Sequence, residues 1–176
     1  MTATIGDAIG APSPPARRAL SVGAGFGVVA AALGFAMGSA PLADNSFFTH
    51  LATGRLILDT GAVPGADPYS WTAPDEPWVV QSWLASVIYA SAERAGDAWG
   101  LRLLGGVLGA ALAVALWRLT SSGRTVVSRL VVLAPAIAVL STFWSLRPLL
   151  FGLLLLALLR IAADEGFALN GISVGS

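Results

Sequence analysis

Long apolar runs alternate with short polar segments along most of this 176-residue chain. Four runs consist mainly of Ala, Leu, Val, Gly and aromatic residues, and they cover residues 19–40, 101–117, 126–144 and 149–161. The first run has the roughly 20 residues that a helix needs to cross the apolar core of a bilayer. The pattern therefore predicts an all-α integral membrane protein with about four transmembrane helices.

Two segments between the first and second runs have a weaker, one-sided apolar pattern. The apolar side chains of residues 45–59 fall close to one helical stripe, and Gly61 can end that helix. Arg55 and Asp59 are spaced to pair across one turn of it. Residues 78–92 carry Trp and Tyr, which are typical of membrane interfaces. We expect two juxtamembrane amphipathic helices on the outer surface, joined by a turn-rich crossing.

Arginine residues set the expected orientation of the spans. Arg17 and Arg18 precede the first run, and three more, Arg118, Arg124 and Arg129, follow the second run. The positive-inside bias places both groups in the cytoplasm, so the N-terminus is cytoplasmic in a multi-pass protein of the plasma membrane. If residues 78–92 also crossed the membrane, the second group would lie outside, against this bias.

The expected organisation has five parts. They are a disordered tail at 1–18, a first membrane helix at 19–40, an extracytoplasmic loop at 41–99, three membrane helices within 100–163, and a cytoplasmic tail at 164–176. A cleaved signal peptide is the alternative for the first run, because basic residues precede it and small residues follow it. The length of the run favours a membrane anchor.

Small residues inside the runs indicate how the helices pack. Glycines recur at a spacing of four residues, in the pairs Gly23 and Gly27, Gly34 and Gly38, and Gly105 and Gly109. This spacing allows close approach of helix backbones in membranes. We therefore expect helix contacts at these glycines and assign them no catalytic role. Pro135 is expected to kink the third span.

The composition agrees with a membrane protein and excludes several other classes. Hydrophobic residues make up 56% of the chain and charged residues 11%, whereas ordinary soluble domains carry about 25% charged residues. The net charge is zero and no basic tract indicates a nucleic-acid partner. The absence of cysteine excludes disulfides, thiol catalysis and Cys-based zinc sites.

Acidic residues are concentrated in the expected outer loop. They are Asp44, Asp59, Asp67, Asp75, Glu76, Glu93 and Asp97. Asp44 lies between the first span and the first surface helix, so it is either the N-cap of that helix or a catalytic acid. His50, the only histidine, is either an interfacial polar residue or a ligand. Asp67 precedes Pro68 and is either a turn former or part of a site.

The order of these pieces resembles the N-terminal part of the GT-C superfamily. This superfamily comprises polytopic glycosyltransferases that use polyprenyl-phosphate-linked sugars, including protein O-mannosyltransferases and lipid A aminoarabinose transferases. They have one membrane helix, an outer loop that opens with an acidic motif, two juxtamembrane helices, and a second membrane helix that ends in a basic turn. The similarity covers residues 19–165.

A bacterial subgroup resembles the chain more closely. It has an acid six residues before a His, then Gly, then Pro and an Asp-Pro-aromatic-Ser motif. The matching residues are Asp44, His50, Gly54, Pro64, Asp67, Pro68, Tyr69 and Ser70, followed by Trp78 and by the segment QSWL at residues 81–84.

The resemblance implies a transferase of the cell envelope that moves a sugar from a polyprenyl-phosphate donor to an acceptor on the outer face. It implies that Asp44 is the general base or a metal-organising group. The substrate-binding residues that it implies are His50, Asp67, Gln81 and Trp83. A divalent cation, Mg or Mn, would have Asp44 and Asp67 as candidate ligands. Ser46 stands where many relatives carry a second acid, which counts against a metal there.

The chain is much shorter than a GT-C enzyme. We therefore expect an N-terminal module, a truncated product, or a small subunit that completes its fold with a partner membrane subunit, inactive alone. The alternative is a non-catalytic polytopic scaffold whose outer loop binds another protein or lipid head groups. A transporter is disfavoured, because residues 19–40 and 131–144 contain no ionisable side chain.

Overall fold

The computed structural model describes residues 22–41, 44–72, 76–123, 125–141 and 146–169. Within these ranges the chain forms five helices, and its one β-bridge lies outside any strand. The helices are α1 (Val22–Gly38), α2 (Asn45–Thr60), α3 (Trp83–Leu119), α4 (Val126–Ser141) and α5 (Pro148–Leu169). The prediction of an all-helical fold is confirmed for this part of the chain. The expected tail at residues 1–18 lies outside it.

A sharp bend divides α3 into two limbs. Gly96 (φ −163°, ψ 27°) and Asp97 (φ 48°, ψ −139°) leave helical geometry, so residues 83–95 form a short limb and residues 98–119 a long limb. The bend folds the end of the short limb onto the start of the long limb. A Cβ atom on Gly100 would lie less than 3.0 Å from the carbonyl oxygen of Ala92. The bend therefore requires glycine at position 100.

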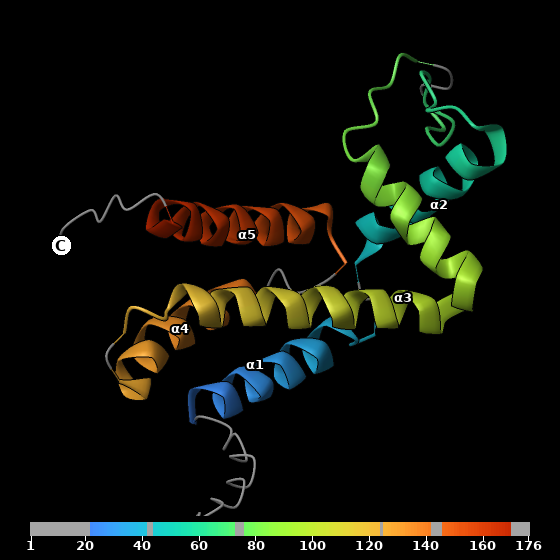
Figure 1. The fold of residues 1–176 in the computed structure, drawn as a ribbon. Helices are drawn as coiled ribbons and strands as arrows, with labels where there is room; N and C mark the ends of the chain where they lie inside the picture. The colour runs from blue at the N-terminus through green and yellow to red at the C-terminus, as the bar shows by residue number, and fades with distance from the viewer. Residues whose placement is uncertain (1–21, 42–43, 73–75, 124, 142–145, 170–176) are drawn as a thin grey trace, which may run out of the picture.

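The other helices are arranged around α3 (Figure 1). α1 and α5 lie along the long limb, and α2 packs across the short limb. α4 is attached to the far end of the long limb by Arg129, whose guanidinium lies 3.7 Å from the centroid of the Trp117 ring and donates a hydrogen bond to the Trp117 carbonyl oxygen at 2.5 Å.

The long limb and α1 are in backbone contact. Cβ atoms on Gly34 and Gly38 would lie less than 3.0 Å from the carbonyl oxygens of Gly109 and Gly105, respectively. The close contacts that the spacing predicts at these four glycines are confirmed. No larger residue fits at Gly34 or Gly38 unless the two helices separate.

The short limb and α2 form a second closely packed pair. A Cβ atom on Gly54 would lie less than 3.0 Å from the carbonyl oxygen of Ser86. Two ion pairs cross between the helices, Arg55 with Glu93 and Arg94 with Asp59. Arg55 and Asp59 therefore pair with the short limb instead of with each other, because the two helices pack face to face.

The first helix of the outer loop is close to the prediction, and the second begins later. α2 ends at Gly61, which adopts a left-handed conformation (φ 70°). The second surface helix starts at Trp83 instead of residue 78. The preceding chain is extended and bridged, because the backbone N–H of Trp78 donates to Gly65 and the carbonyl oxygen of Glu76 accepts from Asp67, both at 2.9 Å.

One helix among the described residues, α3, is long and apolar enough to cross a membrane. α1 and the Val126–Ala138 part of α4 are apolar but shorter. The expectation of four membrane spans is thus supported for one helix only. α5 continues to Leu169, beyond the residue 164 at which a tail is predicted, and Arg160 pairs with Asp164 one turn later in it.

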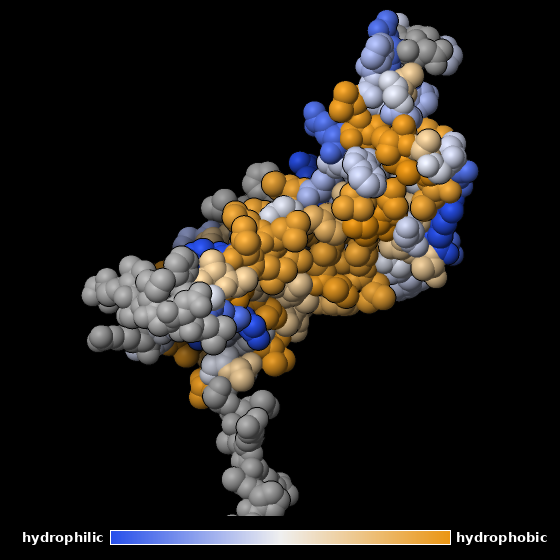
Figure 2. All heavy atoms as spheres, turned by 45° about the horizontal axis from the view of Figure 1, so that its top comes forward, coloured by the Kyte–Doolittle hydropathy of each residue, from blue (hydrophilic) through white to orange (hydrophobic). Residues whose placement is uncertain are grey.

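The surface of the helical body is unusually apolar. Figure 2 shows a broad hydrophobic surface across its middle, with hydrophilic residues towards its ends. More than half of each of several large apolar side chains is exposed on α1 and α5, including Val28, Leu33, Leu155, Leu156 and Leu159. Surfaces of this kind contact a membrane or another protein.

The glycine contact between α1 and the long limb can be tested with Gly38→Ala. We expect a loss of about 1–3 kcal/mol of stability, because the backbone of Gly105 cannot move aside like a flexible side chain. For a chain of this size, each kcal/mol of lost stability lowers the melting temperature by roughly 2–4 °C. The melting temperature is measured on detergent-solubilised protein. Gly25→Ala is the control, since no atom lies within 4 Å of its Cβ position. Equal melting temperatures of the two variants would contradict the contact.

The bend can be tested with Gly100→Ala. The new methyl group would press on the carbonyl oxygen of Ala92 and oppose the bend, so we expect a melting temperature lower by several degrees. Gly96→Ala is the matched control, because Gly96 has negative φ and open space around its Cβ position. A protein that tolerates both changes equally would not have this bend.

Candidate functional site

Several helix ends meet beside the bend of α3. The C-terminal end of α1 is tied to the long limb by Arg102, whose Nε donates to the carbonyl oxygen of Ser39 at 2.9 Å. The N-termini of α2 and α5 meet at the ion pair between Asp44 and Arg147. Figure 1 shows these ends gathered near the middle of the structure. We call the set of Asp44, Ser46 and Arg147 the helix junction.

The carboxylate of Asp44 is held by contacts on both of its oxygen atoms. Oδ1 accepts hydrogen bonds from the backbone N–H (3.0 Å) and hydroxyl (2.8 Å) of Ser46, which makes Asp44 the N-cap of α2. Oδ2 is buried, makes no well-aligned hydrogen bond with any described residue, and lies 2.5 Å from Nε of Arg147. The N-cap interpretation of Asp44 is confirmed.

These contacts keep Asp44 ionised. The hydrogen bonds from Ser46, and then the charge of Arg147, hold the pKa of the Asp44 carboxyl below its ordinary value against the opposing effect of desolvation. The carboxylate is therefore negative at neutral pH and accepts a proton only weakly. Proton transfer to Asp44 would first require that the pair with Arg147 open.

Sequence reasoning did not identify Arg147. Arg147 occupies the N-cap position of α5, since its carbonyl oxygen accepts from the backbone N–H of Leu150 at 2.9 Å and Pro148 begins the helix. One signal was present: Arg147 is the only ionisable residue between Arg129 and Arg160, and a lone charge between two apolar runs marks a functional or structural site.

His50 has a defined hydrogen-bonding state. Its Nδ1 lies 3.3 Å from the hydroxyl of the buried Ser86, and that hydroxyl donates its one proton to the carbonyl oxygen of Ser82 at 3.2 Å. In this arrangement Ser86 accepts from Nδ1–H, and Nε2 of His50 is the acceptor of the ring. Burial lowers the pKa of His50, and the charge of Asp44 opposes this change. His50 is therefore neutral at pH 7.

His50 and Gln81 line one pocket of about 300 Å³ between α2 and the start of α3. We call it the polar pocket; its other lining residues are Thr49, Thr53, Trp78, Val79, Val80 and Ser82. Its volume is at the small end of the range for ligand pockets. An imidazole, an amide and hydroxyl groups together can donate to and accept from a ligand rich in hydroxyl groups. Two of the four predicted substrate-binding residues are thus brought together.

The other two predicted binding residues lie elsewhere. Oδ1 of Asp67 accepts from the backbone N–H groups of Tyr69 (2.8 Å) and Ser70 (3.2 Å), so Asp67 forms a turn, as the alternative interpretation holds. Trp83 begins α3 and is 48% exposed. Neither residue lines the polar pocket. The rings of Tyr69 and Trp78 meet edge to face, with their centroids 5.8 Å apart. The turn therefore packs against Trp78, which lines the polar pocket.

No metal centre is evident in the described part of the chain. No three His, Cys, Asp or Glu side chains come together there in a group that could hold a metal ion. The suggested pair of Asp44 and Asp67 gains no support, because one carboxylate is occupied by Ser46 and Arg147 and the other by its own turn.

No family model, no curated protein and no solved structure matches this chain.

The burial of His50 predicts a pH-dependent stability. The pKa of His50 is lower in the folded chain than its ordinary value of 6.5. Below about pH 6.5 the unfolded chain therefore binds more protons than the folded chain does. Stability should therefore be complete above this value and fall between pH 6.5 and 5.5. The loss is at most about 1.4 kcal/mol, the free energy of one pH unit.

His50→Gln should remove this dependence and keep a donor for Ser86. Melting temperatures of both proteins at pH 7.5 and pH 5.5 provide the measurement. His50 is the only histidine, so no other imidazole contributes. The same fall in both proteins would show that His50 is not the group responsible.

Proposed function

We propose that this chain is the N-terminal module of a membrane glycosyltransferase of the GT-C type. It moves a sugar from a polyprenyl-phosphate donor to an acceptor on the outer face of the plasma membrane. α1, the long limb of α3, α4 and α5 are its membrane spans, and α2 and the short limb lie on the outer surface. A partner membrane subunit, or further chain, completes the donor site.

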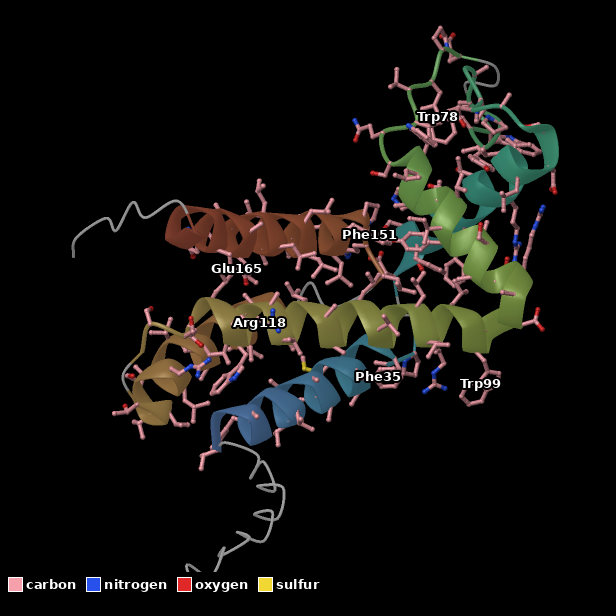
Figure 3. The ribbon with its side chains drawn as sticks, in the orientation of Figure 1. Phe35, Trp78, Trp99, Arg118, Phe151 and Glu165 are labelled. Carbon is pink, nitrogen blue, oxygen red and sulfur yellow. The ribbon has the colours of Figure 1, made fainter. Side chains whose placement is uncertain are left out.

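The count of arginines slightly favours this placement. On it six of the ten are cytoplasmic, Arg17, Arg18, Arg118, Arg124, Arg129 and Arg160, and four are outside, Arg55, Arg94, Arg102 and Arg147. At the end of the long limb opposite the bend lie Arg118, Arg129 and Arg160, and in Figure 3 Arg118 and Glu165 project towards each other between α3 and α5. Arginines mark the cytoplasmic side, and acidic residues contribute little to orientation. The exposed apolar surfaces of α1 and α5 then face lipid.

The observation that carries the proposal is the position of Asp44. The acid to which the resemblance assigns catalysis lies between the end of α1 and the start of α2, and its contacts keep it ionised. It begins the same helix that carries His50 into the polar pocket. In the proposal His50 and Gln81 bind hydroxyl groups of the sugar. Asp44 stabilises positive charge near the reacting carbon, and takes a proton from the acceptor once Arg147 has moved away.

A second candidate function is a non-catalytic membrane scaffold. It is favoured by the contacts of Asp44, each of which also stabilises the fold: the bonds with Ser46 cap α2, and the pair with Arg147 connects α2 with α5. In a scaffold these contacts would be the whole role of the residue.

Asp44→Asn distinguishes the two functions. Asn is as good an N-cap as Asp but lacks the charge. Transfer of labelled sugar from polyprenyl phosphate should be measured in membranes that contain the protein with its natural partners. We expect a fall of about 100-fold or more at an unchanged protein level.

Asp59→Asn is the matched control, because it removes another ion-paired acid of α2 outside the site. It should leave transfer within about twofold, as surface pairs contribute little. Normal transfer in Asp44→Asn would favour the scaffold and reject the catalytic role.

A further inference from the structure

A second hollow lies on the other side of α2 from the polar pocket. It has a volume of about 540 Å³ and separates α2 from the start of the long limb. The residues that line this α2–α3 groove include Phe47, Phe48, Leu51, Arg55, Glu93, Leu101 and Arg102. The four on α2 form one helical stripe, whereas Thr49, His50 and Thr53 face the polar pocket from the opposite side of the helix. The groove and the polar pocket are therefore separate sites.

The groove is apolar but carries one unbalanced positive charge. Arg55 is neutralised by Glu93, with Nε 2.6 Å from its carboxylate. Arg102 has no acidic partner among the described residues. Its Nε donates to Ser39, its guanidinium lies 5.1 Å from the centroid of the Trp99 ring, and no described residue accepts from its Nη atoms. A ligand that fits both features has an anionic group and an apolar body.

The position of the groove at the edge of the apolar surface indicates that this ligand is a lipid. Arg102 contacts the chain just after the end of α1, so it lies where the apolar helices begin. Trp99 is 75% exposed and points away from the helices (Figure 3). Further along the long limb, away from the bend, the exposed Leu103 and Val107 continue the apolar surface. Trp and Arg at the edge of an apolar surface are typical of the head-group level of a bilayer.

We infer that the α2–α3 groove binds one anionic phospholipid of the bilayer, with its phosphate on the Nη atoms of Arg102 and an acyl chain against the exposed side of Phe48. A guanidinium is well suited to bind phosphate oxygens by paired hydrogen bonds. The inference rests on the membrane placement in the proposed function and is independent of sugar transfer.

The test is native mass spectrometry of the full chain released from detergent after titration with phosphatidylglycerol. We expect one tightly bound lipid, and at least tenfold weaker binding of phosphatidylcholine, whose head group has no net charge. Glycerol phosphate, which has the anionic group without the chains, should not bind measurably. Equal binding of the two lipids, or tight binding of glycerol phosphate, would overturn the inference.

Arg102→Gln should weaken binding of phosphatidylglycerol about tenfold or more. Arg94→Gln is the matched control: Arg94 is a half-exposed arginine of α3 that pairs with Asp59 and does not line the groove. Phe48→Gln is a second variant, at a side chain already 56% exposed, so its folding should be unaffected. It should also weaken binding, through the loss of apolar contact.

If both Arg102→Gln and Phe48→Gln bound the lipid as Arg94→Gln does, the groove would not be the lipid site. The two ideas fail separately. Normal sugar transfer in Asp44→Asn would reject the catalytic role but not the lipid site, whereas equal binding of phosphatidylglycerol and phosphatidylcholine would reject the lipid site but not the catalytic role.

Discussion

The backbone contact between α1 and the long limb of α3 is the interaction on which the rest of the structure depends. Gly34 and Gly38 allow the two helices to approach without intervening side chains. This contact fixes the position at which α1 ends, and therefore the position from which α2 starts. Asp44 reaches Arg147 because the end of α1 at Gly38 and the chain just before α5 at Leu146 both lie against Gly105 of the long limb. In a membrane, where apolar side chains gain little by leaving lipid, such close packing is a main source of helix association.

Around this contact, the two flanks of α2 have opposite character. One flank has neutral polar groups, with Nδ1 of His50 beside the hydroxyl of the buried Ser86. The other flank is apolar and ends at the unbalanced charge of Arg102. A single amphipathic helix thus separates a small polar pocket from a more apolar groove, which in our proposals receive a sugar and a lipid, respectively. A transferase that uses a lipid-linked sugar needs both environments within a short distance.

Much of the fold could be predicted from local patterns. The ends of α2 follow from Asp44 and Gly61, whose capping preferences depend only on the neighbouring residues. The glycine contacts follow from the four-residue spacing. The pairing of Asp44 with Arg147 could not be predicted, because it joins helix ends that are far apart in the sequence and depends on how α5 packs against α3. The late start of α3 depends on a β-bridge, which residue preferences alone do not indicate.

The candidate site was also predictable only in part, because it too depends on how separate helices pack against each other. His50 and Gln81 meet in one pocket because α2 and the beginning of α3 pack closely at Gly54. Asp67 belongs to the same motif in the sequence, but its carboxylate is used by its own turn. Motif order directs attention to this segment of the chain. Which side chains of that segment face a common space was decided by packing.

The bend of α3 also sets how far the short limb and α2 are rotated around the axis of the long limb. A straight helix of 37 residues would be about 56 Å long, far longer than the roughly 30 Å core of a bilayer. The break at Gly96 and Asp97 divides this length and fixes the angle at which the short limb leaves the long limb. Inserting one residue between the bend and the contact at Gly105 would turn everything before it by about 100° around the axis of the long limb. The polar pocket would then face a different direction, so insertions that a surface loop tolerates would here reorient the pocket relative to the long limb.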